Sequence, residues 1–335
     1  MSECKFDYEV LLSKKIPNSD PEKVGFTYSG LYRVISKEKP SAIITNAFSI
    51  ATIKLWLLSY FKKISYIIWS GAINRKDSSD SFLRQFQRRL LIRRAVGFVA
   101  YGTKAKEYLV SLGAKPENIE IGINTVDTEF YRQEAGKIKL ENEKIRKYEN
   151  ESDNKKHLLY IGHLTKRKNV QKILDIIKIL SNKRKNIILD IVGDGEERKR
   201  LKKYVVDNHL TDYVMFHGFK QKADMPKYMA KADCFLFQTD FDIWGLVLVE
   251  AMSAGLPCIS SIYSGATHDL VKDGVTGFAV DFSETEKVAE RINWILDNPE
   301  EAMKIGKNAS RFIEENASIE KSAEGFVRAI TKIIG

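Results

Sequence analysis

The chain has 335 residues, enough for two domains, because single hydrophobic cores usually stop growing before that length. Hydrophobic residues make up 44% of the sequence, which argues against a disordered chain or a repeat array. The formal net charge is +10, but no recognised nucleic-acid motif accompanies it, so we expect no nucleic-acid partner.

Cysteine usage and the start of the sequence indicate the compartment. Cys4, Cys234 and Cys258 lack metal-ligand spacing, so we expect free thiols rather than a disulfide or a zinc site. The start has no apolar h-region, and the longest apolar stretch, Ala47–Phe61, is interrupted by Lys54 and is shorter than the roughly 20 residues of a spanning helix. We therefore expect a cytoplasmic protein.

Short apolar runs alternate with amphipathic stretches in the first part of the chain, a pattern typical of βαβ units with a parallel sheet. The predicted strands are Tyr8–Leu12, Ala42–Thr45, Tyr66–Trp69, Gly97–Tyr101 and Ile119–Ile123. The predicted helices are Gly30–Glu38, Phe48–Phe61, Phe82–Arg94 and Thr103–Leu112.

The predicted helix Phe82–Arg94 offers one explanation of the positive charge. On a helix its apolar residues form one stripe with arginines beside it, as in an interfacial helix on anionic lipid. The arginines are Arg84, Arg88, Arg89, Arg93 and Arg94. The alternative, a lysine-rich soluble surface with no binding role, stays open. An anionic membrane surface is thus one expected partner, which would place the protein peripherally on the inner face of the membrane.

The segment from Gln133 to Lys156 is dominated by Glu, Lys, Asn and Arg, which predicts a solvated, partly helical connector. We expect a first domain over residues 1–133, a connector over 134–156, a second domain over 157–315 and a C-terminal helix over 316–335 that can pack back on the first domain. The alternative, a surface helix inside one domain, moves the boundary but changes little else.

Continuous apolar runs predict buried strands after the connector. They are Leu158–Ile161, Ile187–Val192, Tyr213–Phe216, Cys234–Phe237, Pro257–Ser260 and Gly277–Val280. The predicted helices are Val170–Ser181, Glu196–Asn208, Pro226–Ala230 and Leu246–Ala254. The tail Glu284–Ile334 is predicted to form helices that break near Asn298-Pro299 and Asn316. Ligands of such sheets bind at the carboxyl ends of the strands.

The strand Leu158–Ile161 leads into a candidate anion site. Gly162 permits a tight turn and a close ligand approach, and three cations, Lys166, Arg167 and Lys168, precede the next helix, whose free amides favour anions. This arrangement predicts a diphosphate site. The alternative is ordinary surface charge, because glycine turns with lysines are common.

The segment Asp242–Pro257 is more specific. A loop carries Asp242, Gly245 opens a helix, and Glu250 follows more than one turn later. A carboxylate on the loop and another on the helix suit the binding of a polyhydroxylated ligand by accepting hydrogen bonds from its hydroxyls. Taken singly, Asp242 could cap the helix and Glu250 could lie on a solvated face.

These residues resemble the retaining glycosyltransferases of family 4, which have an α/β GT-B fold of two Rossmann-like parallel-sheet domains facing a cleft and transfer a sugar from a nucleoside diphosphate. The resemblance covers about residues 95–335. Its motifs are Asn124–Asp127, Tyr160–Leu164 with Lys168, Ile191–Glu196, Val214–Gly218, Asp242–Glu250, and Ser264-Gly265 with Asp269–Phe278.

The resemblance implies roles for individual residues. Lys168 neutralises the donor diphosphate, Glu250 binds the ribose hydroxyls, and Asp242 replaces the first glutamate of the E-x7-E pair that holds the donor sugar. Amides at Gly245 and Leu246 face sugar or phosphate. We expect Lys168, Asp242 and Glu250 to be catalytic, and donor contacts from Gly162, His163, Arg167, Lys168, Gly193, Gly218, Phe219, Asp242, Trp244, Gly245, Leu246 and Glu250, with the base near Gly218 and Phe219.

The sequence also departs from the family. His163 stands where an arginine usually pairs with the lysine, and Arg167 or Lys166 can substitute for it. The loop after Tyr66–Trp69 lacks the histidine that often lies near the transferred sugar. The sequence begins at what corresponds to the second strand, so we expect a shortened N-terminal domain without the first βα unit.

The expected function is retaining glycosyl transfer from a nucleoside diphosphate sugar to a saccharide or lipid-linked saccharide. No Asp-x-Asp set lies in a suitable loop, so we expect neither metal nor other cofactor. One alternative is a degenerate relative that binds nucleotide or a partner without transfer. A GT-B sugar-nucleotide epimerase explains the Asp242–Glu250 pair less well.

Overall fold

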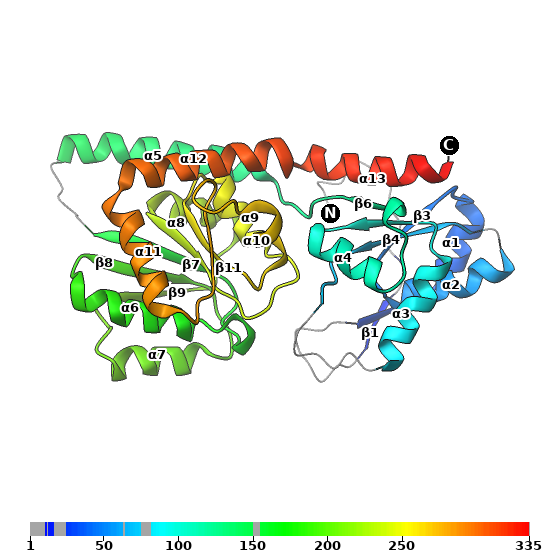
Figure 1. The fold of residues 1–335 in the computed structure, drawn as a ribbon, viewed down its shortest axis with the longest axis horizontal. Helices are drawn as coiled ribbons and strands as arrows, with labels where there is room; N and C mark the ends of the chain where they lie inside the picture. Colours follow the sequence, from blue (N-terminus) through cyan, green and yellow to red (C-terminus); the bar gives the residue numbers. More distant parts are fainter. Residues whose placement is uncertain are drawn as a thin grey trace. The chain divides into compact units, whose positions relative to one another are not determined.

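The computed structural model describes residues 11, 13–16, 25–62, 64–74, 82–149 and 155–334. The chain divides into two compact units (Figure 1). Unit 1 comprises residues 1–101, 105–122 and 324–335, and unit 2 comprises residues 102–104 and 123–323. Of the predicted strand Tyr8–Leu12, all but Leu11 lies outside the described residues.

Unit 1 contains a four-stranded parallel sheet in the order β3-β4-β5-β6. Its strands are β3 (Ile43–Asn46), β4 (Tyr66–Ser70), β5 (Gly97–Ala100) and β6 (Ile119–Ile121). Its helices are α1 (Leu31–Glu38), α2 (Ile50–Phe61), α3 (Phe82–Arg94), α4 (Thr103–Ser111) and the last part of α13 (Ile319–Ile334). A separate antiparallel pair joins β1 (Ser13–Ile16) to β2 (Gly25–Tyr28).

Strand β4 is buried on both faces, because successive side chains point to opposite sides of a strand. Tyr66 and Ile68 join a core with residues of α2, α3 and α4. Ile67 and Val99 face the opposite way and pack with Ala329 and its neighbours on α13, namely Phe326, Ile330 and Ile333. The α13 residues from Glu324 onward therefore cover the second face of the unit 1 sheet.

Unit 2 contains a six-stranded parallel sheet in the order β12-β11-β10-β7-β8-β9. Its strands are β7 (Lys156–Ile161), β8 (Ile187–Val192), β9 (Val214–Gly218), β10 (Cys234–Phe237), β11 (Cys258–Ser261) and β12 (Phe278–Val280). The chain adds strands on one side of β7 and then, from β10 onward, on the other. This reversal makes β7 and β10 the switch point, where ligands of doubly wound sheets bind.

Helices cover both faces of the unit 2 sheet (Figure 1). Leucine and isoleucine side chains of α6 and α11 share a buried core with the sheet, while α5 contacts α8 and α9, and α12 contacts α9. The helices are α5 (Thr128–Glu149), α6 (Gln171–Lys183), α7 (Arg198–Asp207), α8 (Met225–Lys231), α9 (Leu246–Ser253), α10 (Gly265–Leu270), α11 (Thr285–Asp297) and α12 (Pro299–Asn316).

The strands of the two parallel sheets and the predicted helices lie where the periodicity predicts them, apart from small shifts at their ends, whereas β1 and β2 were not predicted. The tail breaks between α11 and α12 at Asn298 and between α12 and α13 near Ala317, which confirms the predicted breaks. The segment predicted as a connector is helical to Glu149 and belongs to α5, whose first turns bury Tyr131, from the predicted first domain, and Ala135, from the predicted connector. The short helix α10 was not predicted.

Two of the three cysteines lie in described segments. Cys234 and Cys258 are buried free thiols, and burial raises the pKa of each thiol. Cys4 lies outside the described residues. Among the described residues, no helix combines the length and apolar composition needed to cross a bilayer.

A buried carboxylate bridges three strands of the unit 2 sheet. Asp190 on β8 accepts a hydrogen bond from His157 Nδ1 on β7 at 2.7 Å and another from His217 Nε2 on β9 at 2.6 Å. Burial raises the pKa of Asp190, but the bonds and charges of the two histidines outweigh it, so this pKa lies below its ordinary value.

Candidate functional site

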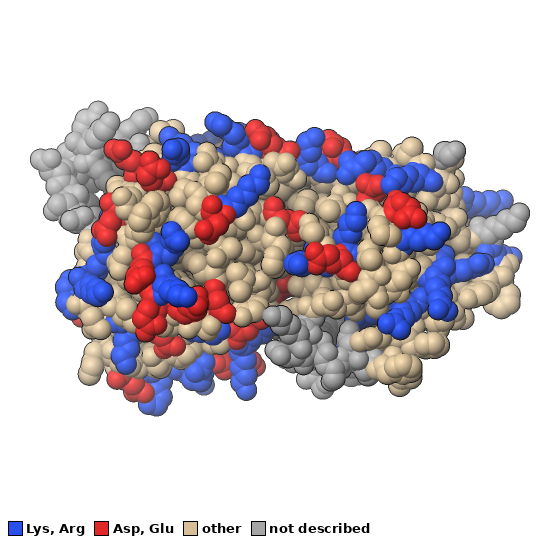
Figure 2. All heavy atoms as spheres, viewed as in Figure 1, with Lys and Arg blue, Asp and Glu red and all other residues tan. Residues whose placement is uncertain are grey.

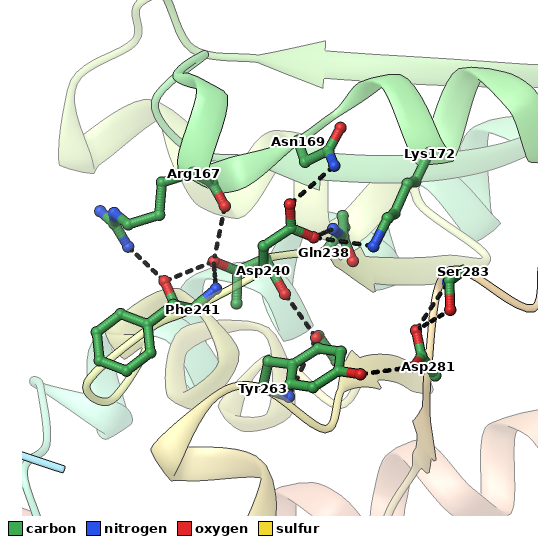
Figure 3. Close-up of polar contacts among 11 residues, drawn as sticks. Arg167, Asn169, Lys172, Gln238, Asp240, Phe241, Tyr263, Asp281 and Ser283 are labelled. Atoms are coloured by element: carbon green, nitrogen blue, oxygen red, sulfur yellow. Dashed lines mark hydrogen bonds and ion pairs between the residues drawn. The ribbon is translucent and has the colours of Figure 1, made fainter. Parts of the chain in front are cut away.

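The loops after β7 and β10 lie side by side at the switch point of the unit 2 sheet (Figure 3). The Asp240 amide donates to the Arg167 carbonyl at 3.0 Å, and Arg167 Nη1 donates to the Phe241 carbonyl at 2.7 Å. These bonds bring together the cation segment (Lys166–Lys168) and the loop that carries Asp242.

Lys168 and Asp242 form the centre of this arrangement. The Lys168 side chain leaves a short 3₁₀ turn, Lys166–Lys168, and the residue is only 9% exposed. Its Nζ lies 2.5 Å from Asp242 Oδ2 and 5.2 Å from the centroid of the Phe237 ring. Because a partly buried ammonium needs a partner, the pair places one fixed cation at the carboxyl ends of β7 and β10.

Arg167 adds a second cation to the site. Its Nη1 lies 3.9 Å from Asp242 Oδ2 and is anchored on the Phe241 carbonyl. The arginine that we expected to compensate for His163 is therefore next to Lys168 and Asp242. His163 itself is an exposed residue whose carbonyl accepts a hydrogen bond from the Tyr160 hydroxyl at 3.2 Å.

Asp242 also organises the backbone around it. Its Oδ1 accepts from the Trp244 amide at 3.3 Å, and its own amide donates to the Tyr263 carbonyl at 3.0 Å. Asp242 therefore holds the loop before α9 and does not cap the helix, whose N-cap Gly245 has no side-chain cap hydrogen bond. A carboxylate has about four acceptor positions, so those that remain can accept hydroxyl donors of a ligand.

Gly245 opens α9 in a conformation that favours glycine. Its φ is 101°, and a Cβ at this position would overlap the Phe237 ring. The helix begins at Leu246, so its first amides have no partners within the helix and favour an anion. Trp244 is 3% exposed, and its indole N–H has no hydrogen-bond acceptor among the described residues.

Three glycines lie together at the carboxyl ends of β7, β8 and β9. The Gly162 amide donates to the Val192 carbonyl at 3.0 Å, and the Gly193 amide donates to the Gly218 carbonyl at 2.9 Å. Gly193 has a φ of 141°, and a Cβ there would overlap the Gly162 carbonyl. The glycines therefore leave this edge without side chains. Phe219, which follows Gly218, is 66% exposed.

Glu250 has a different set of partners. Its carboxylate accepts a hydrogen bond from the Tyr131 hydroxyl of α5 and is attracted by Lys222. Burial raises the pKa of Glu250, while the Tyr131 bond and the Lys222 charge oppose that rise. Tyr131 and Lys222 were missed in the sequence because they lie on segments distant from the Asp242–Glu250 motif.

The sequence also gave no sign of Asp240 as a site residue. It lies two residues before Asp242, and its side chain is bonded to Asn169, Lys172 and Gln238 (Figure 3). The available signal was only its spacing from Asp242, and an isolated aspartate in a loop is usually a turn residue.

Comparison with known proteins identifies the family. The model of the group 1 glycosyl transferases matches residues 141–312. N-acetyl-alpha-D-glucosaminyl L-malate synthase of Bacillus anthracis is 27% identical over 206 residues, which is 61% of this chain and 51% of that protein. An uncharacterized glycosyltransferase of Methanocaldococcus jannaschii is 28% identical over 254 residues, which is 73% of this chain and 61% of that protein.

A solved structure has the same fold. The crystal structure of Anabaena HepE in complex with UDP matches with a TM-score of 0.74 and 20% identity, over 90% of this chain and 81% of that chain. The chain spans only 51% to 61% of the two curated relatives. With a family model that matches half of its residues and two parallel-sheet units, the chain belongs to the group 1 glycosyltransferase family and has the GT-B fold.

Proposed function

We propose that this protein transfers a sugar from a nucleoside diphosphate sugar to a saccharide or lipid-linked saccharide acceptor. The observation that carries the proposal is the Lys168–Asp242 pair, with Arg167 beside it, at the switch point of the unit 2 sheet. A doubly wound sheet binds its ligand at this edge, and two cations there suit a diphosphate. The UDP bound to the similar fold of HepE supports a uridine nucleotide as the first to test.

The protein must stabilise the negative charge that develops on the diphosphate as the glycosidic bond breaks. We propose that Lys168, Arg167 and the first amides of α9 do this without a metal or other cofactor, and that the sugar keeps its anomeric configuration. The carboxylate of Asp242 would accept hydroxyls of the sugar, and that of Glu250 those of the ribose. Removal of one preorganised donor from such a site costs roughly 3–4 kcal/mol in the transition state.

The surface of unit 1 supports an acceptor in an anionic membrane. Phe82, Leu83 and Phe86 of α3 are 81%, 75% and 52% exposed, and Phe61 of α2 is 82% exposed. Exposed apolar side chains flanked by arginines are typical of a helix that binds at the interface of anionic lipid. A pocket of about 350 Å³ on the same unit is lined by Tyr32, Lys54, Leu57 and Leu58, among others.

Two of the five arginines of α3 have packing roles instead. Arg88 contacts the Tyr108 hydroxyl and lies over the Phe48 ring, and Arg94 donates to the Ser59 carbonyl at 2.9 Å and lies over Tyr60. The membrane proposal therefore concerns Arg89 and Arg93, which are exposed. Elsewhere, basic and acidic side chains are interspersed on the face shown in Figure 2.

Nucleotide binding without transfer is the second candidate function. It is favoured by the exposed His163, which stands where the resemblance expects an arginine, and by the direct pairing of Asp242 with Lys168. A degenerate relative would keep the nucleotide affinity and show no turnover.

The first experiment measures thermal stabilisation by a panel of nucleoside diphosphates and nucleotide sugars. At about 100 times its dissociation constant, a ligand adds about 2.7 kcal/mol to the free energy of unfolding. We expect one nucleotide to stabilise the wild type and not the Lys168→Ala variant. Absence of any shift with the wild type would contradict the proposed function.

Turnover separates the two candidates. The nucleotide sugar that stabilises the protein is incubated with saccharide and lipid-linked acceptors, and release of the nucleoside diphosphate is measured. We expect release with the wild type and a loss of about 10²–10³ in rate for Lys168→Ala. Stabilisation without release would favour binding without transfer.

A further inference from the structure

A carboxylate outside the predicted motif joins the two loops of the donor site. Asp240 Oδ2 accepts from Asn169 Nδ2 at 2.8 Å, and Asp240 Oδ1 accepts from Lys172 Nζ at 2.9 Å and from Gln238 Nε2 at 3.0 Å (Figure 3). Asn169 ends the 3₁₀ turn after β7 and Lys172 lies in the first turn of α6, whereas Asp240 belongs to the loop after β10. The two oxygens thus join the loop after β10 to the end of the 3₁₀ turn and to the start of α6.

The bonds of Asp240 hold the chain on both sides of the two donor-site cations, Arg167 and Lys168. Arg167 and Lys168 immediately precede Asn169, so the side-chain bonds to Asp240 fix the chain on one side of them. The backbone bond from the Asp240 amide to the Arg167 carbonyl fixes it on the other side. Movement of Asp240 would therefore move the backbone that carries both cations.

Asn169 shows why a side-chain anchor is needed here. Its φ is 40°, a left-handed conformation that costs an L-residue free energy and that asparagine tolerates better than most. This residue ends the 3₁₀ turn of the cations and turns the chain into α6. The hydrogen bond to Asp240 stabilises that conformation, and with it the end of the turn.

The charge of Asp240 is neutralised away from the diphosphate. A carboxylate beside a phosphate site would repel the ligand, but the Lys172 ammonium compensates this one. The Lys172 side chain is 23% exposed and that of Asp240 is 41% exposed. Asp240 is therefore paired with Lys172, whereas Lys168 and Arg167 lie beside Asp242.

We propose that Asp240 is a positioning residue that sets where Lys168 and Arg167 lie over the donor diphosphate. The inference rests on the proposed function, because it assigns a task to the same site. Asp240 acts through residues 166–172, which carry the two cations. Its loss should therefore weaken binding of a nucleoside diphosphate more than binding of the corresponding monophosphate.

The test is titration calorimetry with UDP and UMP, or with the nucleoside diphosphate that stabilises the wild type most and its monophosphate. The variants are Asp240→Ala, Asp240→Asn and Asn169→Gly, the last of which keeps the left-handed backbone and removes only the bond to Asp240. We expect Asp240→Ala and Asn169→Gly to weaken UDP binding about tenfold and UMP binding less than about twofold, as for a lost charge-assisted hydrogen bond. Asp240→Asn is expected to fall between wild type and Asp240→Ala.

The control is Asp207→Asn on α7, a carboxylate outside the two donor-site loops that accepts from Lys203 Nζ at 2.6 Å. It should leave the ratio of UDP to UMP affinity unchanged. In a Lys168→Ala background, Asp240→Ala should weaken UDP binding less than it does in the wild type, because one of the two cations that it positions is already absent.

Equal weakening of UDP and UMP by Asp240→Ala, or full additivity with Lys168→Ala, would overturn the inference while leaving the proposed function intact. A wild type that binds no nucleoside diphosphate would overturn the proposed function and the inference with it.

Discussion

At the scale of single residues, the proton affinity of Glu250 depends on neighbours that come from outside its own helix. Burial raises the pKa of Glu250, and the Tyr131 hydroxyl and the Lys222 ammonium oppose the rise. The proposed role, accepting ribose hydroxyls, needs the ionised form, which exists only above that pKa. Nucleotide affinity should therefore fall on acidification, at a higher pH than for an ordinary glutamate.

Tyr131→Phe removes one hydrogen bond to the ionised form of Glu250, so the pKa of Glu250 should rise further. We expect the acid-side loss of UDP affinity to move to higher pH, with affinity near that of the wild type at alkaline pH. Calorimetric titrations between pH 5 and 8.5 measure it. Tyr228→Phe, which alters a tyrosine packed on His217 instead, is the control; equal pH profiles for the wild type and Tyr131→Phe would contradict the assignment.

The hydrogen bonds of Asp190 should make the free energy of unfolding depend on pH. Its folded-state pKa lies below its ordinary value, so its stabilising contribution is present above the unfolded-state pKa of about 3.9 and is lost as pH falls through the folded-state pKa. Asp190→Asn leaves two histidines without their carboxylate, at a cost of about 2–3 kcal/mol near pH 7. Urea unfolding should show this difference at pH 7 and a smaller one below pH 4; a constant difference would contradict it.

At the scale of elements, the start of α9 is fixed by the left-handed backbone conformation of Gly245, the residue that the sequence predicted to open this helix. Gly245 has a φ of 101° and lies against the Phe237 ring, whereas Gly113 has a φ of 102° with nothing within 4 Å of a built Cβ. The two glycines therefore separate the cost of the left-handed conformation from the cost of a steric overlap.

Gly113→Ala should cost only the strain of a left-handed residue, about 1–2 kcal/mol. Gly245→Ala should cost more, because the new methyl group must displace Phe237, the ring that Lys168 contacts. Thermal unfolding of both variants, with and without nucleotide, measures the difference. Equal losses of stability in the two variants, with nucleotide stabilisation retained in Gly245→Ala, would contradict this expectation and show that the Phe237 ring moves aside without cost.

Periodicity predicted most of the fold because buried parallel strands are continuous apolar runs. The family resemblance assigned Lys168 and Asp242 to one donor site, and the structure places them in the loops after the adjacent strands β7 and β10; their direct ion pair was not predicted. The contact between Glu250 and Tyr131 could not be predicted either, because Tyr131 is distant in the sequence and lies in the segment that we assigned to the first domain. Pairings between distant helices depend on packing that no local pattern encodes.

At the scale of the whole molecule, unit 1 presents apolar and basic side chains on α3. Each arginine near an anionic bilayer contributes about 1 kcal/mol at moderate ionic strength. Replacing Arg89 and Arg93 by alanine should therefore weaken binding to phosphatidylglycerol vesicles by roughly 30-fold, and Phe82→Ser with Phe86→Ser should weaken it further. Sedimentation with vesicles measures this.

The control for membrane binding is the replacement of Lys199 and Lys202 by alanine on α7 of unit 2, which should change vesicle binding little. Wild-type protein that fails to sediment with anionic vesicles at low salt would remove the membrane from the proposed partners. The interfacial helix would then be an ordinary basic surface, the alternative that the net charge of +10 left open.

The packing of α13 on unit 1 has a consequence for protein synthesis. Ile67 and Val99 are covered by side chains from the last residues of the chain, including Ala329 and Ile333. Domains usually fold as units while the chain emerges from the ribosome. Here the sheet of unit 1 is translated early, yet one of its faces stays uncovered until the residues of α13 from Glu324 onward have been made. A ribosome-stalled chain that stops before Glu324 should therefore be sensitive to proteases in unit 1, although all four strands of its parallel sheet are already made.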